Sequence, residues 1–137
     1  MENPIRQRLD AVRQAVLKVH KALIDSERGT YEQTVGRIQS TNQFLQLVIQ
    51  DPWFAWLQPI SQLIVSMDEA VDSESPLTAA QVEAFIRETS RLLAPSDIGE
   101  GLSRHYHDAM QRDPNVVLAH GELMRVLGPR KPKTEDP

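Results

Sequence analysis

Histidine is the residue type in this chain best suited to chemistry, because an imidazole can act near neutral pH as a general base or as a metal ligand. The chain has four histidines, and they differ in their surroundings. His120 falls on the apolar face of the last expected helix, beside Val116 and Leu123. The sequence therefore predicts that His120 is buried and hydrogen-bonded, either as a structural core residue or as part of a binding site.

His20 lies at the edge of the apolar stripe of the first expected helix. If that helix continues, Glu27 and Tyr31 lie on the same face and form a polar groove with it. His20 and Glu27 are about 10 Å apart along a helix axis, which is too far for both to bind one metal ion. His20 therefore has either a structural or interfacial role, or a place in a small-molecule site.

Asp68 is the acidic residue best placed to support a histidine. It borders the apolar arc of the central expected helix and can face His20 or His120 across a bundle, where it would orient the imidazole. Its neighbours Glu69 and Asp72 are typical of a solvated helix end. The resulting hypothesis is a ligand-binding site between helices, formed by these residues: His20, Glu27, Tyr31, Asp68 and His120.

The other two histidines, His105 and His107, are two positions apart and point about 160° away from each other on a helix. They cannot bind one ion together, and His107 is expected to face solvent. The sequence contains neither the Glu-x-x-His pair of di-iron bundles nor HExxH, GxSxG, a P-loop or a Rossmann glycine pattern. It has no cysteine either. We therefore predict no catalytic residue, no metal site and no cofactor.

Aromatic residues are concentrated where the central expected helix begins. Helical spacing predicts that Trp53 and Trp56 point into the core and that Phe54 lies on a flank. Phe44 and Leu47 fall off the main apolar stripe of the preceding segment. Large aromatic side chains anchor protein cores and protein interfaces alike, so these five residues form either a covered core or a self-association surface.

The elements that position these residues can be read from hydrophobic spacing. The first stripe predicts a helix over residues 4–28, because apolar residues recur there every three or four positions. Gly29 either ends this helix or lies within it, in which case the helix runs through Tyr31 towards Gly36. Ser40 and Gln43 form a capping pattern that predicts a short buried helix ending at Gln50.

The central helix is expected over Asp51–Asp72, with a bend or a restart at Pro59, because proline removes a backbone hydrogen bond. A capping pattern at Thr78 and Gln81 begins another helix, which Pro95 ends.

Two more helices are expected after Pro95. An amphipathic pattern starting at Leu102 predicts a short helix, and the last helix begins at Asp113-Pro114 and ends at Gly128. Gly121 lies inside that last helix, which suggests close approach of a neighbouring helix.

The expected helices, with no strand-like alternation between them, predict an all-α fold, and the chain length predicts a compact single-domain bundle of about five to six helices over residues 1–128. The chain has 137 residues, of which 40% are hydrophobic and 25% charged, as in ordinary globular proteins. Residues 129–137 contain no apolar side chain and are predicted to form a disordered tail.

The net charge of -4 disfavours nucleic-acid binding. No stretch approaches the length of a membrane span, and the first residues do not resemble a signal peptide, so we expect a cytoplasmic protein without a membrane partner. The favoured function is a non-enzymatic interaction or regulatory protein that forms a homodimer, or binds another protein, through apolar helix surface. The alternative is a bundle, possibly an enzyme, that binds a small molecule or metal between helices.

Overall fold

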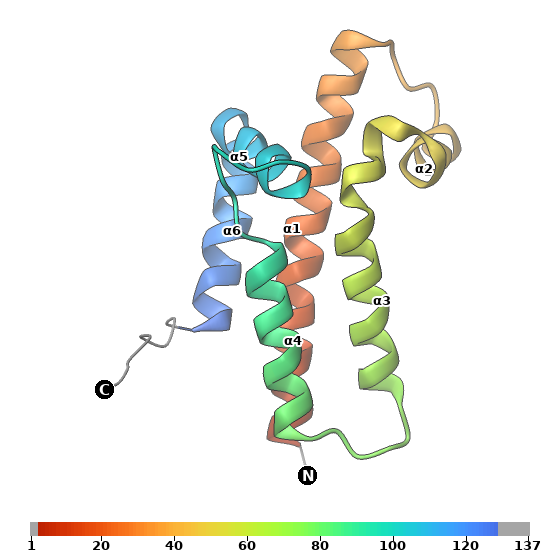
Figure 1. Cartoon of the computed structure of the whole chain (residues 1–137). Helices are drawn as coiled ribbons and strands as arrows, with labels where there is room; N and C mark the ends of the chain where they lie inside the picture. The colour runs from red at the N-terminus through yellow and green to blue at the C-terminus, as the bar shows by residue number, and fades with distance from the viewer. Residues whose placement is uncertain (1–2, 129–137) are drawn as a thin grey trace.

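The computed structural model describes residues 3–128, which form an all-helical bundle (Figure 1). The predicted fold class is confirmed. The predicted disorder of residues 129–137 lies outside the described residues. In chain order the elements are six α-helices and one short 3₁₀ helix: α1 (Pro4–Thr34), α2 (Thr41–Gln50), η1 (Pro52–Leu57), α3 (Gln58–Asp72), α4 (Ala79–Leu92), α5 (Leu102–Arg112) and α6 (Pro114–Leu127).

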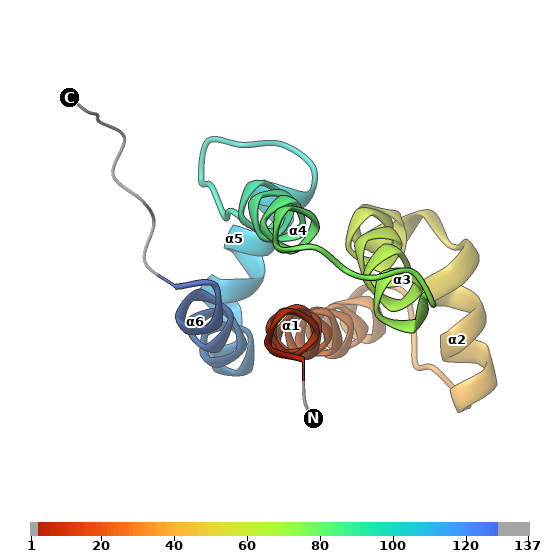
Figure 2. The ribbon, with the colours of Figure 1, turned by 90° about the horizontal axis from the view of Figure 1, so that it is seen from below.

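The long helix α1 is the centre of the molecule, with α3, α4 and α6 packed around it (Figure 2). Its predicted apolar stripe is confirmed, because five of its residues are fully buried: Leu9, Val12, Val16, Val19 and Leu23. The predicted end near residue 28 is wrong, and the alternative of a continuous helix holds. Gly29 is exposed inside α1 and does not interrupt its hydrogen bonds.

The segment after Asp51 is two elements, because the 3₁₀ helix η1 precedes α3 and Pro59 lies in the first turn of α3. The restart expected near Pro59 is confirmed. A 3₁₀ helix has three residues per turn, so residues three apart share a face. Phe54 and Leu57 are accordingly buried. Trp53 and Trp56 pack against the core as predicted but are only half-buried, whereas the prediction that Phe54 lies on a flank was wrong.

Helix α2 begins as predicted, with the Ser40 hydroxyl accepting a hydrogen bond from the Gln43 amide at 3.1 Å. The prediction that α2 is buried is wrong, because none of its residues is buried. Its side chains Leu45 and Ile49 are 53% and 58% exposed. Only its inner side, including Phe44, packs against the hydrophobic core.

Helices α4 and α6 begin where their capping patterns predicted. The Thr78 hydroxyl accepts from the Gln81 amide at 3.1 Å, and the Gln81 side chain accepts from the Thr78 amide at 2.8 Å. The Asp113 carboxylate caps α6, and Gly128 follows α6 with a φ of 84°.

The inward face of α6 is formed by Val116 and Leu123, which are buried as expected, and by Ala119. Val117 and Met124 lie outside this face and are 43% and 38% exposed. The expected close approach at Gly121 is wrong, since a Cβ at that position would meet nothing within 4 Å.

Candidate functional site

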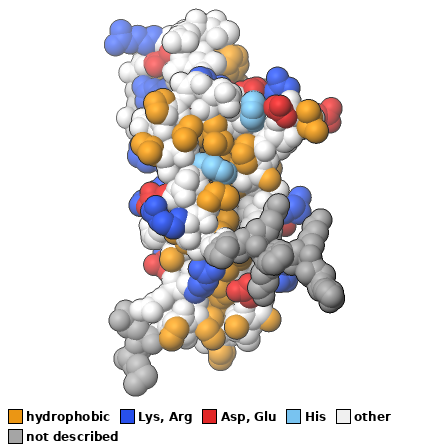
Figure 3. All heavy atoms as spheres, turned by 90° about the vertical axis from the view of Figure 1, so that its left-hand side faces the viewer, with side chains coloured by type: hydrophobic (Ala, Val, Ile, Leu, Met, Phe, Trp, Pro, Cys, Tyr) orange, Lys and Arg blue, Asp and Glu red, His pale blue; other side chains and the backbone are white. Residues whose placement is uncertain are grey.

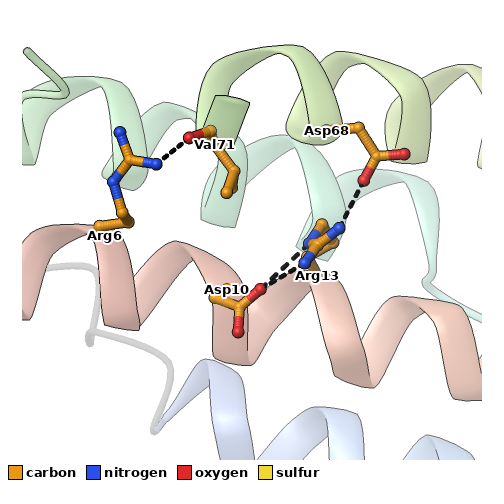
Figure 4. A network of polar contacts seen from close by, with 5 residues as sticks. All are labelled: Arg6, Asp10, Arg13, Asp68 and Val71. Carbon is orange, nitrogen blue, oxygen red and sulfur yellow. Dashed lines mark hydrogen bonds and ion pairs between the residues drawn. The ribbon is translucent and has the colours of Figure 1, made fainter. Parts of the chain in front are cut away.

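Asp68 lies in a polar seam between α1 and α3 (Figure 4). Its carboxylate accepts a hydrogen bond from Arg13 at 2.7 Å, and Arg13 also donates to Asp10 at 2.5 Å. Hydrogen bonds to Asp10 and Asp68 raise the pKa of Arg13 above its ordinary value. In the same seam, Arg6 donates to the backbone carbonyl of Val71. Asp68 therefore links two helices through Arg13, and the prediction that it faces His20 or His120 was wrong.

His20 also lies between α1 and α3. Its Nε2 atom is 3.0 Å from the Ser61 hydroxyl oxygen, and the side chain is half-buried. Burial lowers the pKa of His20, because a charged imidazolium loses hydration there. The imidazole is therefore neutral near pH 7 and serves as one half of an interhelical hydrogen bond.

His120 pairs with Tyr106 between α6 and α5. Its Nδ1 atom is 2.6 Å from the Tyr106 hydroxyl oxygen, and the two rings meet edge to face. Tyr106 is fully buried, and this burial raises its pKa, so the phenol keeps its proton and forms a hydrogen bond with the imidazole. His120 is half-buried, where the sequence predicted full burial, and burial lowers its pKa.

Glu27 is a buried carboxylate that binds Arg112 at the end of α5. The distance between Arg112 Nη2 and Glu27 Oε2 is 2.7 Å, and Arg112 Nε also donates to the Ser26 hydroxyl at 3.1 Å. Tyr31, one turn further along α1, contacts the rings of Trp53 and Phe54 at centroid distances of 5.6 Å and 5.7 Å. The five predicted ligand residues thus have separate partners in different parts of the bundle.

The prediction that His107 faces solvent was wrong, because His107 is half-buried, with its Nδ1 atom 3.5 Å from Asp108. His105 is exposed and stacks on Trp56, with the ring centroids 4.8 Å apart. Across residues 3–128 there is no cluster of three or more His, Asp or Glu side chains that could hold a metal ion.

The aromatic residues predicted as an interface attach α2 and η1 to the end of α1. Phe44 meets Phe54 at a centroid distance of 6.1 Å, and the Arg28 guanidinium lies 4.7 Å from the Phe44 ring centroid. Phe54 has no exposed surface, so it belongs to the hydrophobic core and not to an interface. The apolar surface that remains free on α2 belongs to other residues, Leu45 and Ile49.

This part of the molecule carries almost no charge. Between residues 38 and 67 the sequence has one charged side chain, Asp51, although 25% of the whole chain is charged. The segment includes all of α2 and η1 and most of α3. In contrast, α1, α4, α5 and α6 each carry acidic and basic side chains.

A groove of about 650 Å³ runs between α3 and α4. Its charged lining residues are Glu88 and Arg91, which pair with each other at 2.6 Å. The other lining residues are apolar or uncharged: Pro59, Gln62, Leu63, Ser66, Ala70, Gln81, Ala84, Phe85 and Leu92. The groove is therefore neutral and largely apolar.

Comparison with protein-family models, curated proteins and solved structures finds no match for this chain. None of the helices in residues 3–128 is long and apolar enough to cross a membrane.

A second exposed apolar area lies on α6, where Leu118 is 70% exposed beside Val117. Hydrophobic side chains gather in the middle of the face that carries α5 and α6 (Figure 3). Unlike α2, α6 itself carries charged residues, Glu122 and Arg125, and Glu122 pairs with Lys18 at 2.7 Å.

The sequence predictions missed Leu45, Ile49 and the α3–α4 groove. The run from 38 to 67, in which Asp51 alone is charged, is the signal that points to the outer side of α2 and to the α3 side of the groove.

Proposed function

We propose that this chain is a non-enzymatic interaction protein that self-associates through the outer face of α2, defined as Asn42, Leu45, Gln46 and Ile49. The observation that supports this proposal is that α2 has no charged residue and that the two aliphatic side chains of its outer face are more than half exposed. Leu45 is 53% exposed and Ile49 is 58% exposed. The outer face of a surface helix ordinarily carries charged residues.

The composition of this face is that of an interface core. Charged residues are depleted at the centres of protein interfaces, whereas exposed apolar patches with polar edges often mark association sites. The four residues of the outer face follow helical spacing, at positions i, i+3, i+4 and i+7. Burying the exposed half of Leu45 and of Ile49 stabilises a complex by about 1 kcal/mol each.

The exposed area on α6 is the main competing surface. Leu118 is more exposed than either residue of α2. However, the Lys18–Glu122 ion pair and Arg125 lie on or beside α6, and covering these charges would cost desolvation energy. We therefore favour α2 as the association surface.

The proposal includes two predictions that rest on the sequence alone. The partner is a protein, in the simplest case a second copy of this chain, and not a nucleic acid, since the net charge is -4. The setting is the cytoplasm.

Sedimentation velocity over a range of protein concentrations tests the proposal. The wild-type chain is expected to form dimers or larger species as its concentration rises. The double substitution Leu45→Glu with Ile49→Glu should make it monomeric, because two buried carboxylates would be unpaired. Its thermal unfolding should stay close to wild type, since both side chains are exposed in the single chain.

The matched control is Val117→Glu with Leu118→Glu on α6, where both side chains are also exposed. This variant should self-associate like the wild type. A wild-type chain that stays monomeric at high concentration contradicts the proposal. So does an α6 variant that alone becomes monomeric.

A further inference from the structure

The α3–α4 groove lies between two helices that both pack against α1. The segment between Asp72 and Ala79 joins α3 to α4 (Figure 2). Small side chains at Ser66, Ala70 and Ala84 line the groove. Small residues let the backbone of another helix come close, so the groove suits a helix better than a bulky rigid group.

The length of the groove matches the length of α2. The α3 side is lined from Pro59 to Ala70, which corresponds to about 17 Å at the helical rise of 1.5 Å per residue. Helix α2 has 10 residues, or about 15 Å of helix. A helix of this size fills the groove along most of its length.

The groove and the outer face of α2 are alike in having no net charge. The α3 side has no charged residue, and Glu88 and Arg91 on the α4 side satisfy each other through two hydrogen bonds, at 2.9 Å and 2.6 Å. A charged helix face would lose its hydration there without gaining a partner. The outer face of α2 is uncharged, and this distinguishes it from α1, α4, α5 and α6.

The side-chain pattern of α2 fits helix-in-groove recognition, in which apolar residues one turn apart act as anchors. Leu45 and Ile49 are four positions apart and are exposed. Asn42 and Gln46 lie beside them and offer amide groups. The groove offers complementary hydrogen-bonding groups on Gln62 and Gln81.

We infer that α2 of one copy of this chain binds in the α3–α4 groove of a second copy. The inference rests on the self-association proposed above and names the surface that receives α2. The contact joins two different surfaces, so it is heterologous. A variant in either surface should therefore lose association, and the two variants should complement each other.

The test combines two variants of the full chain in sedimentation velocity. The α2 variant is Leu45→Glu with Ile49→Glu, and the groove variant is Ser66→Glu with Ala84→Glu. Ser66 and Ala84 are exposed in the single chain, so the fold should tolerate both changes, and unchanged thermal unfolding verifies this. Glutamate is used on both surfaces so that the altered surfaces cannot attract each other.

Each variant alone is expected to be monomeric, with an association constant at least about 10-fold below that of the wild type, corresponding to 1.4 kcal/mol or more. An equimolar mixture is expected to form a 1:1 complex, because the intact α2 of the groove variant meets the intact groove of the α2 variant.

Three distinct outcomes overturn the inference. If the groove variant associates like the wild type while the α2 variant is monomeric, α2 binds elsewhere, so the inference fails and the proposed function stands. If the wild type itself is monomeric, the proposed function fails too. A mixture that stays monomeric also contradicts the inference, because intact surfaces of both kinds are then present without binding.

Discussion

At the scale of single residues, the polar side chains between the helices hold the bundle together in pairs. Arg13 pairs with Asp68, and Glu27 pairs with Arg112. His20 and His120 are half-buried, and each forms a hydrogen bond with a hydroxyl group. A hydroxyl can accept or donate, so it suits a neutral imidazole. These pairs satisfy polar groups that would otherwise destabilise the seams around α1.

The burial of His20 and His120 predicts how stability depends on pH. Burial lowers the pKa of both His20 and His120 below the ordinary value of 6.5, so the unfolded chain binds these protons more strongly. Their contribution to stability is complete above about pH 6.5 and is lost as pH falls towards the folded-state pKa values. The melting temperature should therefore decrease between about pH 7.5 and about pH 5.5.

The variant His20→Gln should flatten this pH dependence, because glutamine does not titrate and can still hydrogen-bond to Ser61. Combining it with His120→Gln should flatten the dependence further. Calorimetry at several pH values measures the effect. Hydrogen bonds to Arg104 and Lys18 lower the pKa values of Asp108 and Glu122, respectively. These carboxylates therefore become protonated only at lower pH and do not contribute to the change in this range. An unchanged slope in the double variant would show that neither histidine is responsible.

At the scale of elements, the helices are stabilised mainly by tertiary packing and by caps, and two of them contain an unfavourable glycine. Gly29 in α1 and Gly121 in α6 are exposed, and a Cβ at either position would meet nothing within 4 Å. Neither glycine has the positive φ that would require it. Glycine inside a helix is less stable than alanine because it loses more backbone freedom on folding.

Gly29→Ala and Gly121→Ala are each expected to increase the free energy of unfolding by roughly 0.5–1 kcal/mol. Urea-induced unfolding followed by circular dichroism measures the change. The matched control is Gly101→Ala, which should be destabilising because Gly101 has a φ of 59°. A loss of stability in Gly29→Ala would mean that the helix is under constraint at this position.

At the scale of the whole molecule, charge is distributed unevenly. Of the residues between 38 and 67, Asp51 alone is charged, so α2, η1 and the adjoining part of α3 form a nearly neutral region of a chain with a net charge of -4. In Figure 2 this region, with α2, lies on the opposite side of α1 from α6. Any complex formed there depends on apolar burial and amide hydrogen bonds rather than on ion pairs.

Salt should therefore not weaken self-association. Raising the concentration of NaCl from about 0.05 M to about 0.5 M screens exposed ion pairs and also the repulsion between copies of like net charge. The association constant of the wild-type chain is expected to stay constant or to rise slightly. Sedimentation equilibrium at several salt concentrations measures it, and a decrease of 10-fold or more, on the order of 1.4 kcal/mol, would indicate an ionic interface instead.

The sequence by itself determined the helices and most of their ends. The buried stripe of α1 and the caps at Ser40, Thr78 and Asp113 depend on residues within a few positions of each other, so local spacing is enough to predict them. The length of α1 was left open, because a glycine such as Gly29 is compatible with either a helix end or a helix interior.

Only the tertiary structure decided which side chains meet and which surfaces remain free. Asp68 binds Arg13, 55 positions earlier in the chain, and this pairing depends on how α3 packs along α1. The 3₁₀ geometry of η1 decided that Phe54 is buried and left Trp53 half-exposed. The exposure of α2 and the α3–α4 groove likewise follow from the positions of whole helices around α1, and those positions depend on contacts between residues far apart in the sequence.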